Sequence, residues 1–327
     1  MPLPDNKQVV KLSEELVSTI RDTFKTPDNY RPVHAKGQLV KGSFTPSKDA
    51  SKISKAEIFS KPSTPLILRY STSPGIKNFP DNGEDGSRGF ALRFVLSEDG
   101  HRHFDIITNN GFGFITGTGE GFLEQFQAIK TNTFDKYLEK YPHAKHFTEN
   151  HSPSHAISFA TEIWHSVNAF KFVNAEGAER FFRWRIVPWQ GVMKYSTADA
   201  QKQSKHFHFD DLQWRLTHNR PIKYRLLAQL AEEGDPTNDS TKTWPETNEF
   251  VEMGEIVVDQ LWNMDDGNPA GEAQKRIIYD PVPRQIEGIE ASDDPLIEVR
   301  AAAYLISGKI RRDHGDEIVE QATDLKE

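Results

Sequence analysis

The sequence contains no cysteine and only 4 methionines among its 327 residues. The absence of cysteine excludes disulfide bonds and all thiolate chemistry. No run of about 18 consecutive apolar residues occurs, so no helical membrane span is predicted. The opening segment, Met1–Lys7, lacks the charged and then apolar pattern of a signal peptide. We therefore expect a soluble cytoplasmic protein without a cleaved leader.

An excess of charge of one sign is also missing. The chain has 40 basic and 48 acidic residues, and the net charge of -8 is spread along it without a polybasic arm. This balance argues against nucleic acid or an anionic membrane as a partner. What the chain does have is 21 phenylalanines. They predict a rigid aromatic interior, suited to packing or to lining a flat hydrophobic ligand.

Strand-like alternation dominates the middle of the chain. It is found at residues 66–72, 89–96, 103–108, 169–173, 179–187 and 254–261. The turn Asn174–Gly177 predicts a hairpin between two of these runs, and the alternating basic residues of 179–187 are expected on the outer face of the sheet. With amphipathic helices predicted over 9–24 and 120–141, the pattern indicates an α+β fold, one antiparallel barrel-like sheet plus helices.

Two later segments give weaker signals. Leu226–Ala231 favours a helix by propensity alone. The stretch 263–294 is acidic and rich in glycine and proline, so we expect mostly irregular chain there. At 327 residues, either one large domain or two are compatible with the length.

The stretch 300–312 aligns an unusual set of side chains. Its three consecutive alanines favour a helix, and at about 100° per residue Arg300, Tyr304 and Arg311 fall on one stripe. A nearby guanidinium favours the phenolate form of a tyrosine, and tyrosine is one of the few axial ligands of haem iron. The ordinary alternative is a core tyrosine with two exposed arginines, and this stretch alone leaves both open.

Three other patterns are assigned structural roles. The glycines at 111, 113 and 117 lack the spacing, the lysine and the βαβ context of a phosphate-binding loop. A histidine-rich turn raises the question of a structural zinc site, but it has no cysteine and is interrupted by prolines, which favours solvated loop histidines. That turn holds His143, His146, His151 and His155. The pair His206 and His208 is likewise more compatible with an ordinary helix.

Five short motifs occur in the order and at the approximate spacing of the haem catalases. They are Arg31–Gly37, Arg69–Thr72, Ser87–Ala91, Asn109–Asn110 and Arg300–Arg311. The chain thus resembles that family over residues 28–312, and in length it is similar to the small catalase-related peroxidases. The resemblance implies haem b (iron protoporphyrin IX) as cofactor, and a closed antiparallel barrel of about eight strands in which 226–231 is a strand. It also implies a helical arm over 1–27, a haem-binding domain over 28–315 and a tail over 316–327.

The resemblance implies a role for each matching residue on the distal side. His34 would be the general base, Asn109 would hold the peroxide by a hydrogen bond, and Ser71 would orient His34. Phe122 would cover the porphyrin face and Val33 would narrow the approach. Taken singly, each residue has an ordinary alternative as a strand, turn or core residue, so the set carries the inference.

On the proximal side, Tyr304 would be the axial ligand of the iron, kept as phenolate by Arg300. Arg31, Arg69 and Arg311 would pair with the two haem propionates. The chain also departs from the family pattern. Leu305–Ile310 replaces a proline and a histidine-rich run, and Gly86 stands at the position of an acidic channel residue, with Asp85 one place earlier. Because 15 residues follow Arg312, no nucleotide site is expected.

The resemblance implies a peroxidase that cleaves hydrogen peroxide and oxidises organic donors, with weak catalase activity, because a chain without long terminal extensions is expected to expose the haem edge. One alternative is rearrangement of fatty-acid hydroperoxides, as in allene oxide synthases, although in those a threonine tends to stand at the position of Val33. Another is a non-catalytic haem or lipid carrier, which needs neither His34 nor Asn109. The physiological donor and homo-oligomer formation are left open.

Overall fold

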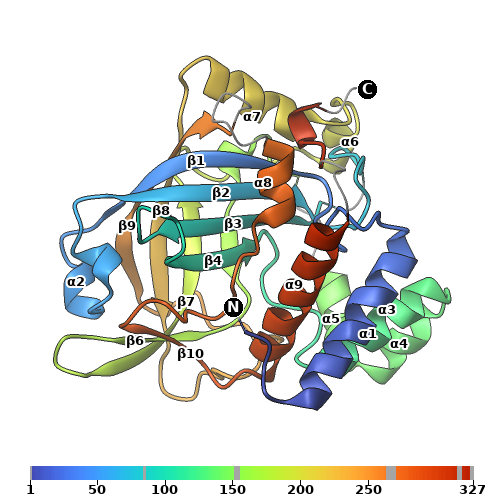
Figure 1. Cartoon of the computed structure of the whole chain (residues 1–327), viewed down its shortest axis with the longest axis horizontal. Helices are drawn as coiled ribbons and strands as arrows, with labels where there is room; N and C mark the ends of the chain where they lie inside the picture. The colour runs from blue at the N-terminus through green and yellow to red at the C-terminus, as the bar shows by residue number, and fades with distance from the viewer. Residues whose placement is uncertain (1, 84–85, 151–154, 263–269, 315–318, 325–327) are drawn as a thin grey trace.

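The structure is a computed structural model that describes residues 2–83, 86–150, 155–262, 270–314 and 319–324 (Figure 1). Within these residues, eight strands close into an antiparallel barrel, in the order β7-β5-β4-β3-β2-β1-β9-β8 and back to β7. They are β1 (Gly37–Pro46), β2 (Thr64–Thr72), β3 (Arg88–Val95), β4 (His103–Asn109), β5 (Trp164–Ser166), β7 (Glu179–Pro188), β8 (Ile222–Leu230) and β9 (Phe250–Leu261). The predicted closed barrel is confirmed.

Two short strands extend the sheet beyond the barrel. β6 (Phe170–Val173) forms the predicted hairpin with β7, and Gly177 in its turn has a φ of 83°. β10 (Ile289–Ala291) pairs with β6. The segment 263–294, expected to be mostly irregular, therefore contains a strand, and it also contains the helix α8 (Ala270–Arg276).

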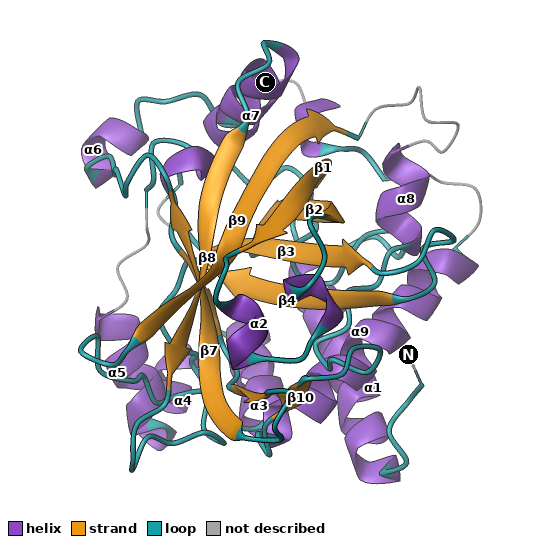
Figure 2. Ribbon diagram, turned by 90° about the vertical axis from the view of Figure 1, so that its left-hand side faces the viewer, coloured by secondary structure: helices purple, strands orange, loops and turns teal. Residues whose placement is uncertain are grey.

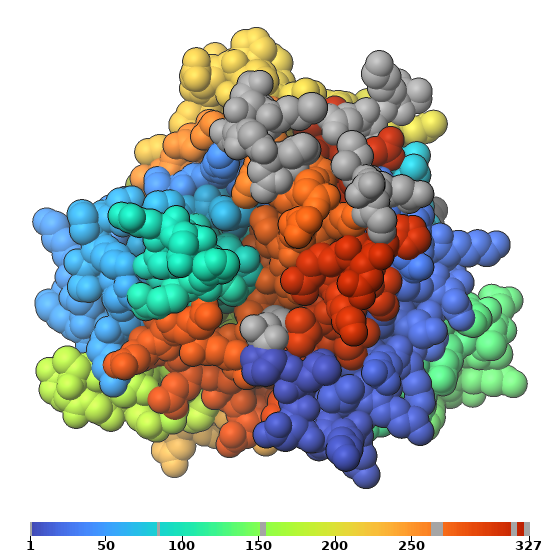
Figure 3. All heavy atoms as spheres, viewed as in Figure 1, coloured from blue at the N-terminus to red at the C-terminus, as the bar shows by residue number. Residues whose placement is uncertain are grey.

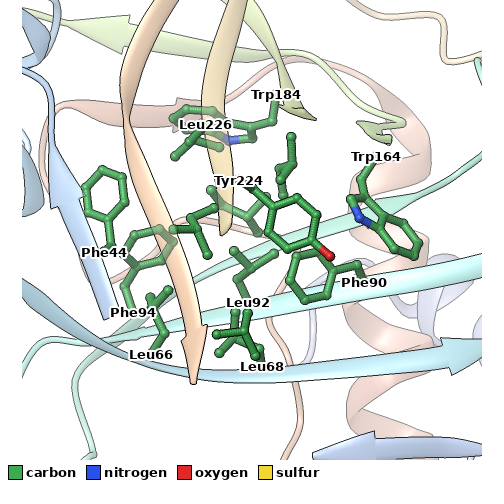
Figure 4. Packing of buried hydrophobic residues seen from close by; sticks show 14 of the residues in the cluster. Phe44, Leu66, Leu68, Phe90, Leu92, Phe94, Trp164, Trp184, Tyr224 and Leu226 are labelled. Atoms are coloured by element: carbon green, nitrogen blue, oxygen red, sulfur yellow. The ribbon is translucent and has the colours of Figure 1, made fainter. Parts of the chain in front are cut away.

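Alternate residues of each strand fill the barrel with large apolar side chains (Figure 4). In β8, Tyr224, Leu226 and Ala228 are fully buried in this core. Burial of the alternate side chains and pairing with β7 and β9 outweigh the helical propensity of this segment, and the strand implied by the family resemblance is confirmed.

Helices cover one side and the ends of the barrel, as Figures 1 and 2 show. The remaining elements are α1 (Lys7–Phe24), α2 (Ala50–Ile53), α3 (Gly119–Lys130), α4 (Phe134–Lys140), α5 (Pro142–Asn150), α6 (Thr197–Ala200), α7 (Phe207–Thr217), α9 (Pro295–Asp313) and three 3₁₀ turns, Glu57–Phe59, Phe159–Thr161 and Ala322–Asp324. α1 and α9 lie side by side on the surface (Figure 3). An apolar cluster joins them to α3 through Leu16, Ile20, Leu123, Phe126 and Val299.

The structure corrects two details of the predicted pattern. The single helix expected over 120–141 is two helices, because Asn132 between them adopts a left-handed φ of 55°. In β7, Arg183 and Arg185 point away from the barrel core but are buried beneath the segment that precedes β9, where Arg183 donates to the carbonyl of Lys242 and Arg185 pairs with Glu246. None of the helices in the described residues is both long and apolar enough to cross a lipid bilayer.

Candidate active site

A cavity of about 360 Å³ lies between the barrel and the helices α1, α3 and α9. Strands β2, β3 and β4 form one wall and α9 another, while α1 and α3 close the remaining side. The structure brings all ten predicted site residues to this one cavity: Arg31, Val33, His34, Arg69, Ser71, Asn109, Phe122, Arg300, Tyr304 and Arg311. Residues far apart in the sequence thus share one chamber, which is the arrangement a site requires.

His34 is held on the barrel wall by an unusual backbone. Its φ is 58°, a left-handed conformation that costs energy for a side chain with a Cβ. Two hydrogen bonds hold it there: the His34 N–H donates to the carbonyl of Ser73 at 2.8 Å, and the His34 carbonyl accepts from Arg69 at 2.8 Å. Such strain is common at functional sites, where it aims a side chain.

Ser71 determines which nitrogen of His34 carries the proton. The Ser71 hydroxyl donates to the carbonyl of Gly89 at 3.3 Å, so its oxygen is left to accept from His34 Nδ1 at 3.1 Å. This places the imidazole proton on Nδ1 and leaves Nε2 free as a base. Burial, together with the positive charges of Arg69 and then Arg31 and Arg300, lowers the pKa of His34 to about 3. The imidazole is therefore neutral at physiological pH.

Asn109 and Phe122 border the cavity from neighbouring elements. Asn109 ends β4, and its Oδ1 accepts from the N–H of Gly111 at 2.9 Å. No described residue accepts a hydrogen bond from its Nδ2, which is thus available as a donor. Phe122 on α3 packs edge to face on Phe126, with ring centroids 5.1 Å apart, and supplies a rigid aromatic face.

Tyr304 stands on α9 at the end of a chain of hydrogen bonds. Arg300, one turn earlier, donates to the phenol oxygen at 3.2 Å and also donates to Asn168 Oδ1. Asn168 in turn donates to Asp294 at 2.7 Å, and Asp294 is the residue that caps the N-terminus of α9. Asn168 and Arg300 therefore connect Asp294, the N-cap of α9, to the phenol of Tyr304 on the same helix.

Three guanidinium groups at the cavity lack a counter-charge. Arg69 and Arg311 are each 3% exposed and Arg31 is partly buried, yet in the described residues none of the three forms an ion pair. They donate instead to neutral oxygens, such as the Ile277 carbonyl, shared by Arg31 and Arg311, and the Gln274 side chain, bonded by Arg69. Burial lowers the pKa of Arg31 to about 10, and it also lowers the pKa values of Arg69 and Arg311 well below their ordinary value. Unpaired buried cations are costly, so these groups fit an anionic ligand.

Two further residues that line this chamber, and that the sequence did not predict, each carry a buried polar atom. Tyr279 is 6% exposed, and its hydroxyl has no hydrogen-bond partner in the part of the chain that the structure describes. Burial raises the pKa of Tyr279 to about 12, so the hydroxyl is a donor. The side-chain oxygen of Gln125 on α3 is buried as well, and no described residue donates a hydrogen bond to it. In a single sequence neither residue stands out, because an isolated tyrosine or glutamine fits a core or a helix surface equally well.

The donor set fits a haem. A phenol beside a guanidinium can ligate ferric iron, three cations without a counter-charge match the two propionates, and the aromatic and aliphatic walls match a porphyrin face. The interval Leu305–Ile310, which departs from the family pattern, continues α9 without a break. Within it, the Ser307 hydroxyl accepts a hydrogen bond from Arg311 at 2.8 Å. Gly86 accepts from Arg88 at 2.7 Å, and Asp85 lies outside the described residues.

The remaining histidines lie elsewhere. In the part of the chain that the structure describes, no group of three or more His, Asp or Glu side chains could hold a metal ion, and His151 lies outside that part. His208 is fully buried, with its Nε2 at 2.7 Å from the carbonyl of Ala156, and His206 precedes α7.

Comparison with known proteins gives a consistent match. The family model named catalase matches residues 19–315. A catalase-related peroxidase of Mycolicibacterium paratuberculosis is 28% identical, and the alignment covers 91% of this chain and 94% of the relative. One of Synechococcus elongatus is also 28% identical, covering 90% and 87%. Catalase-2 of Bacillus subtilis is 28% identical as well, but the alignment covers only 43% of its length. Catalase A from Saccharomyces cerevisiae shares the fold with a TM-score of 0.74 at 22% identity, over 86% of this chain and 61% of that one.

Proposed function

The chain belongs to the catalase family, whose members are peroxide-acting oxidoreductases, and on this basis we propose that it is a haem-dependent peroxidase. In this proposal it cleaves hydrogen peroxide, oxidises small organic donors and has only weak catalase activity. The observation that carries the proposal is the pair of polar groups bordering one cavity, Tyr304 with Arg300 on α9 and His34 with Ser71 on the barrel.

We propose haem b as the cofactor. Tyr304 Oη would bind the iron, with Arg300 stabilising the phenolate, and Arg31, Arg69 and Arg311 would hold the two carboxylates. When bound, haem supplies the iron at which the O–O bond is broken and through which electrons pass from the donor to the peroxide.

The distal residues would handle the proton. Neutral His34 takes it on Nε2 from one peroxide oxygen and returns it to the other, so that water leaves. Asn109 Nδ2 donates a hydrogen bond that holds the peroxide in place while this happens. Ser71 keeps His34 in the tautomer that this transfer needs, because its oxygen accepts from Nδ1.

The preference for donor oxidation over dismutation is supported by the relatives. Nearly the whole length of two catalase-related peroxidases aligns with this chain, against less than half of the Bacillus catalase. No feature of the cavity specifically favours hydroperoxide rearrangement or a carrier function.

Visible absorption of the haem-reconstituted protein tests the cofactor assignment. We expect a ferric spectrum with a phenolate ligand, and we expect Tyr304→Phe to lose stable ferric haem. The matched control is Tyr141→Phe, since the hydroxyl of Tyr141 bonds Glu124 at 2.9 Å and its ring does not line the cavity. A wild-type protein without a Soret band after haem is supplied contradicts the whole proposal.

Three assays then separate the activities. Oxygen release from hydrogen peroxide reports dismutation, oxidation of 2-methoxyphenol reports peroxidase action, and consumption of a fatty-acid hydroperoxide reports rearrangement. We expect the second to be the fastest, and His34→Ala to slow it while leaving haem bound. Unchanged turnover in His34→Ala contradicts the role of His34 as base.

A further inference from the structure

Gln274 is a fully buried amide near the end of α8, and both polar atoms of its side chain form hydrogen bonds. Its oxygen accepts from Arg69 Nε, and its nitrogen donates to the Gly37 carbonyl at 2.7 Å and to Gln321 Oε1 at 2.8 Å. A guanidinium can only donate, so the amide oxygen has to face Arg69 and the nitrogen has to face the two acceptors. The partners of this amide therefore fix its orientation.

Arg69 lies against the segment of chain that carries His34. Its Nη2 donates to the His34 carbonyl at 2.8 Å. A Cβ placed on Gly37 would lie 2.2 Å from the same nitrogen, so a side chain at that position would push the guanidinium aside. Arg69 lines the cavity, yet no described residue accepts a hydrogen bond from its Nη1. The protein thus holds Arg69 by two of its three nitrogens and leaves the donors of the third unused.

The side-chain partner of Arg69 is neutral, whereas an arginine of the neighbouring strand has a charged one. Arg93 of β3 donates through Nε and Nη2 to the two oxygens of Asp105, at 2.9 and 2.7 Å, and neither of these residues lines the cavity. A glutamate in place of Gln274 would have nearly the same shape and would give Arg69 a similar ion pair. The amide holds the guanidinium without neutralising its charge.

Gln321, in the C-terminal segment, holds the amide of Gln274 in turn. It is 4% exposed, and its Oε1 accepts from Gln274 Nε2 and from the N–H of Leu39 in β1 at 3.1 Å. Two residues later, the Thr323 hydroxyl donates to Gln38 Oε1 at 2.8 Å. Residues 319–324 are therefore anchored to both α8 and β1. Without Gln321, one N–H of Gln274 would lose its acceptor and the amide would be less firmly held.

We propose that Gln274 is a positioning residue for the carboxylates of the cofactor: it fixes Arg69 through a neutral hydrogen bond and so keeps the charge of that guanidinium for the ligand, while Gln321 fixes Gln274. The inference rests on the proposed function, in which Arg69 binds a haem carboxylate. A carboxylate side chain at the position of Gln274 would compete with the ligand for the same cation. The neutral amide therefore favours a porphyrin with free carboxylates over one whose carboxylates are esterified.

The test measures how fast haem leaves the protein for apomyoglobin, and it repeats the measurement with haem dimethyl ester, in which both carboxylates are neutral. The variant is Gln274→Glu, which keeps the shape of the side chain and adds a charge. The matched control is Gln285→Glu. Gln285 is exposed and outside the cavity, and its oxygen accepts from the N–H of His103 at 2.9 Å, a bond that a carboxylate also makes.

We expect Gln274→Glu to release haem at least about tenfold faster than wild type, because a hydrogen bond between charged groups is weakened when one of them is already paired. The dimethyl ester should leave this variant no faster than it leaves wild type, since it has no charge for Arg69 to bind. Gln285→Glu should match wild type with both compounds.

Neutral variants separate positioning from charge. Gln274→Met removes the amide without adding a charge, and it should release haem about fivefold faster, the effect of one neutral hydrogen bond. Gln321→Met should give a smaller increase, and it should add nothing in the Gln274→Met background, because Gln321 acts through Gln274. Release of the ester should not change in any of these variants. They also decide the question if Gln274→Glu fails to fold.

The inference is overturned if Gln274→Glu releases haem at the wild-type rate. It is also overturned if haem and the ester both leave faster by the same factor, because that result would be a general loosening of the fold. Additive effects of Gln274→Met and Gln321→Met overturn the role of Gln321. A wild-type protein that takes up no haem refutes the proposed function itself, which is a different result from an unaffected Gln274 variant.

Discussion

Gly89 and His34 are in direct contact across the cavity wall. A Cβ placed on Gly89 would lie 2.8 Å from His34 Cε1, closer than real Cβ atoms approach other atoms, and 3.1 Å from Ser71 Oγ, which is a tight contact. The glycine of β3 therefore lets the imidazole rest against the strand backbone, where Ser71 reaches it. The glycine that follows Arg88 in the sequence motif is therefore required for steric reasons.

We expect Gly89→Ala to slow peroxide cleavage about 100-fold, because the methyl group displaces the imidazole, and misplacing a catalytic group by about 1 Å has effects of this size. Stopped-flow absorption after mixing with hydrogen peroxide measures the rate, and the Soret band shows that haem is retained. Gly83→Ala is the control, since its nearest contacts would be at 3.6 Å. A normal rate in Gly89→Ala would show that His34 tolerates the shift.

Asn168→Ala should change the electronic state of the haem iron. Without Asn168, Arg300 loses the partner that holds it against Tyr304, so the phenolate oxygen keeps more of its charge for the iron. We expect a more negative ferric–ferrous midpoint potential, measured by spectroelectrochemistry. Asn174→Ala, in the β6–β7 turn, should leave the potential unchanged. An unaltered potential in Asn168→Ala would mean that Arg300 is positioned without it.

Tyr279→Phe should weaken haem binding. Tyr279 lines the cavity, its buried hydroxyl has no hydrogen-bond partner among the described residues, and the guanidinium of Arg93 lies over its ring at 5.4 Å. A donor so placed among cations suits a carboxylate of the cofactor, so we expect haem transfer to apomyoglobin to quicken several-fold. Tyr137→Phe removes another buried hydroxyl, on a residue that does not line the cavity, and this variant should transfer haem at the wild-type rate.

The rate of peroxide cleavage should stay nearly constant as the pH is lowered well below about 6. An ordinary imidazole with a pKa of 6.5 is mostly protonated at about pH 5, whereas the pKa of His34 is lowered to about 3. The second-order rate constant should therefore be nearly flat from about pH 7 to about pH 4. A fall centred near pH 6.5 would contradict a buried neutral base.

The same shift has a consequence for stability. In the unfolded chain, His34 is protonated below about pH 6.5, whereas in the folded chain it is protonated only below about pH 3. The unfolded state therefore binds more protons in this window, and the contribution of His34 makes the free energy of unfolding fall as the pH is lowered through it. Denaturant titrations of wild type and His34→Ala across this range measure the difference.

The motifs of the sequence were enough to predict the barrel and ten residues that share its cavity, because each motif combines a backbone requirement with a chemical group. Gly89 next to His34 illustrates this. Local propensity was less reliable: Leu226–Ala231 favours a helix, and only its neighbours β7 and β9 make it a strand. The break between α3 and α4 depends on the backbone of Asn132, which its side chain alone does not reveal.

Residues that position another side chain could not be predicted from the sequence. Asn168 and Asp294 are 126 positions apart and look like a turn residue and a helix cap. Tyr279 and Gln125 were missed for the opposite reason: their buried polar atoms have no hydrogen-bond partner among the described residues, and an absent hydrogen bond leaves no pattern in a sequence. Both kinds of residue become visible only when the cavity is assembled.

The backbone carbonyls at the end of α8 fix Arg31 and Arg311 in place, and Gln274 holds Arg69. Like charges are thus gathered in a buried part of the fold, and the two carboxylates of the proposed haem would relieve their mutual repulsion. When porphyrin is scarce, newly made chains carry that repulsion unrelieved. The melting temperature of the purified protein would then depend on the fraction that carries haem, and cells short of porphyrin would accumulate less folded protein.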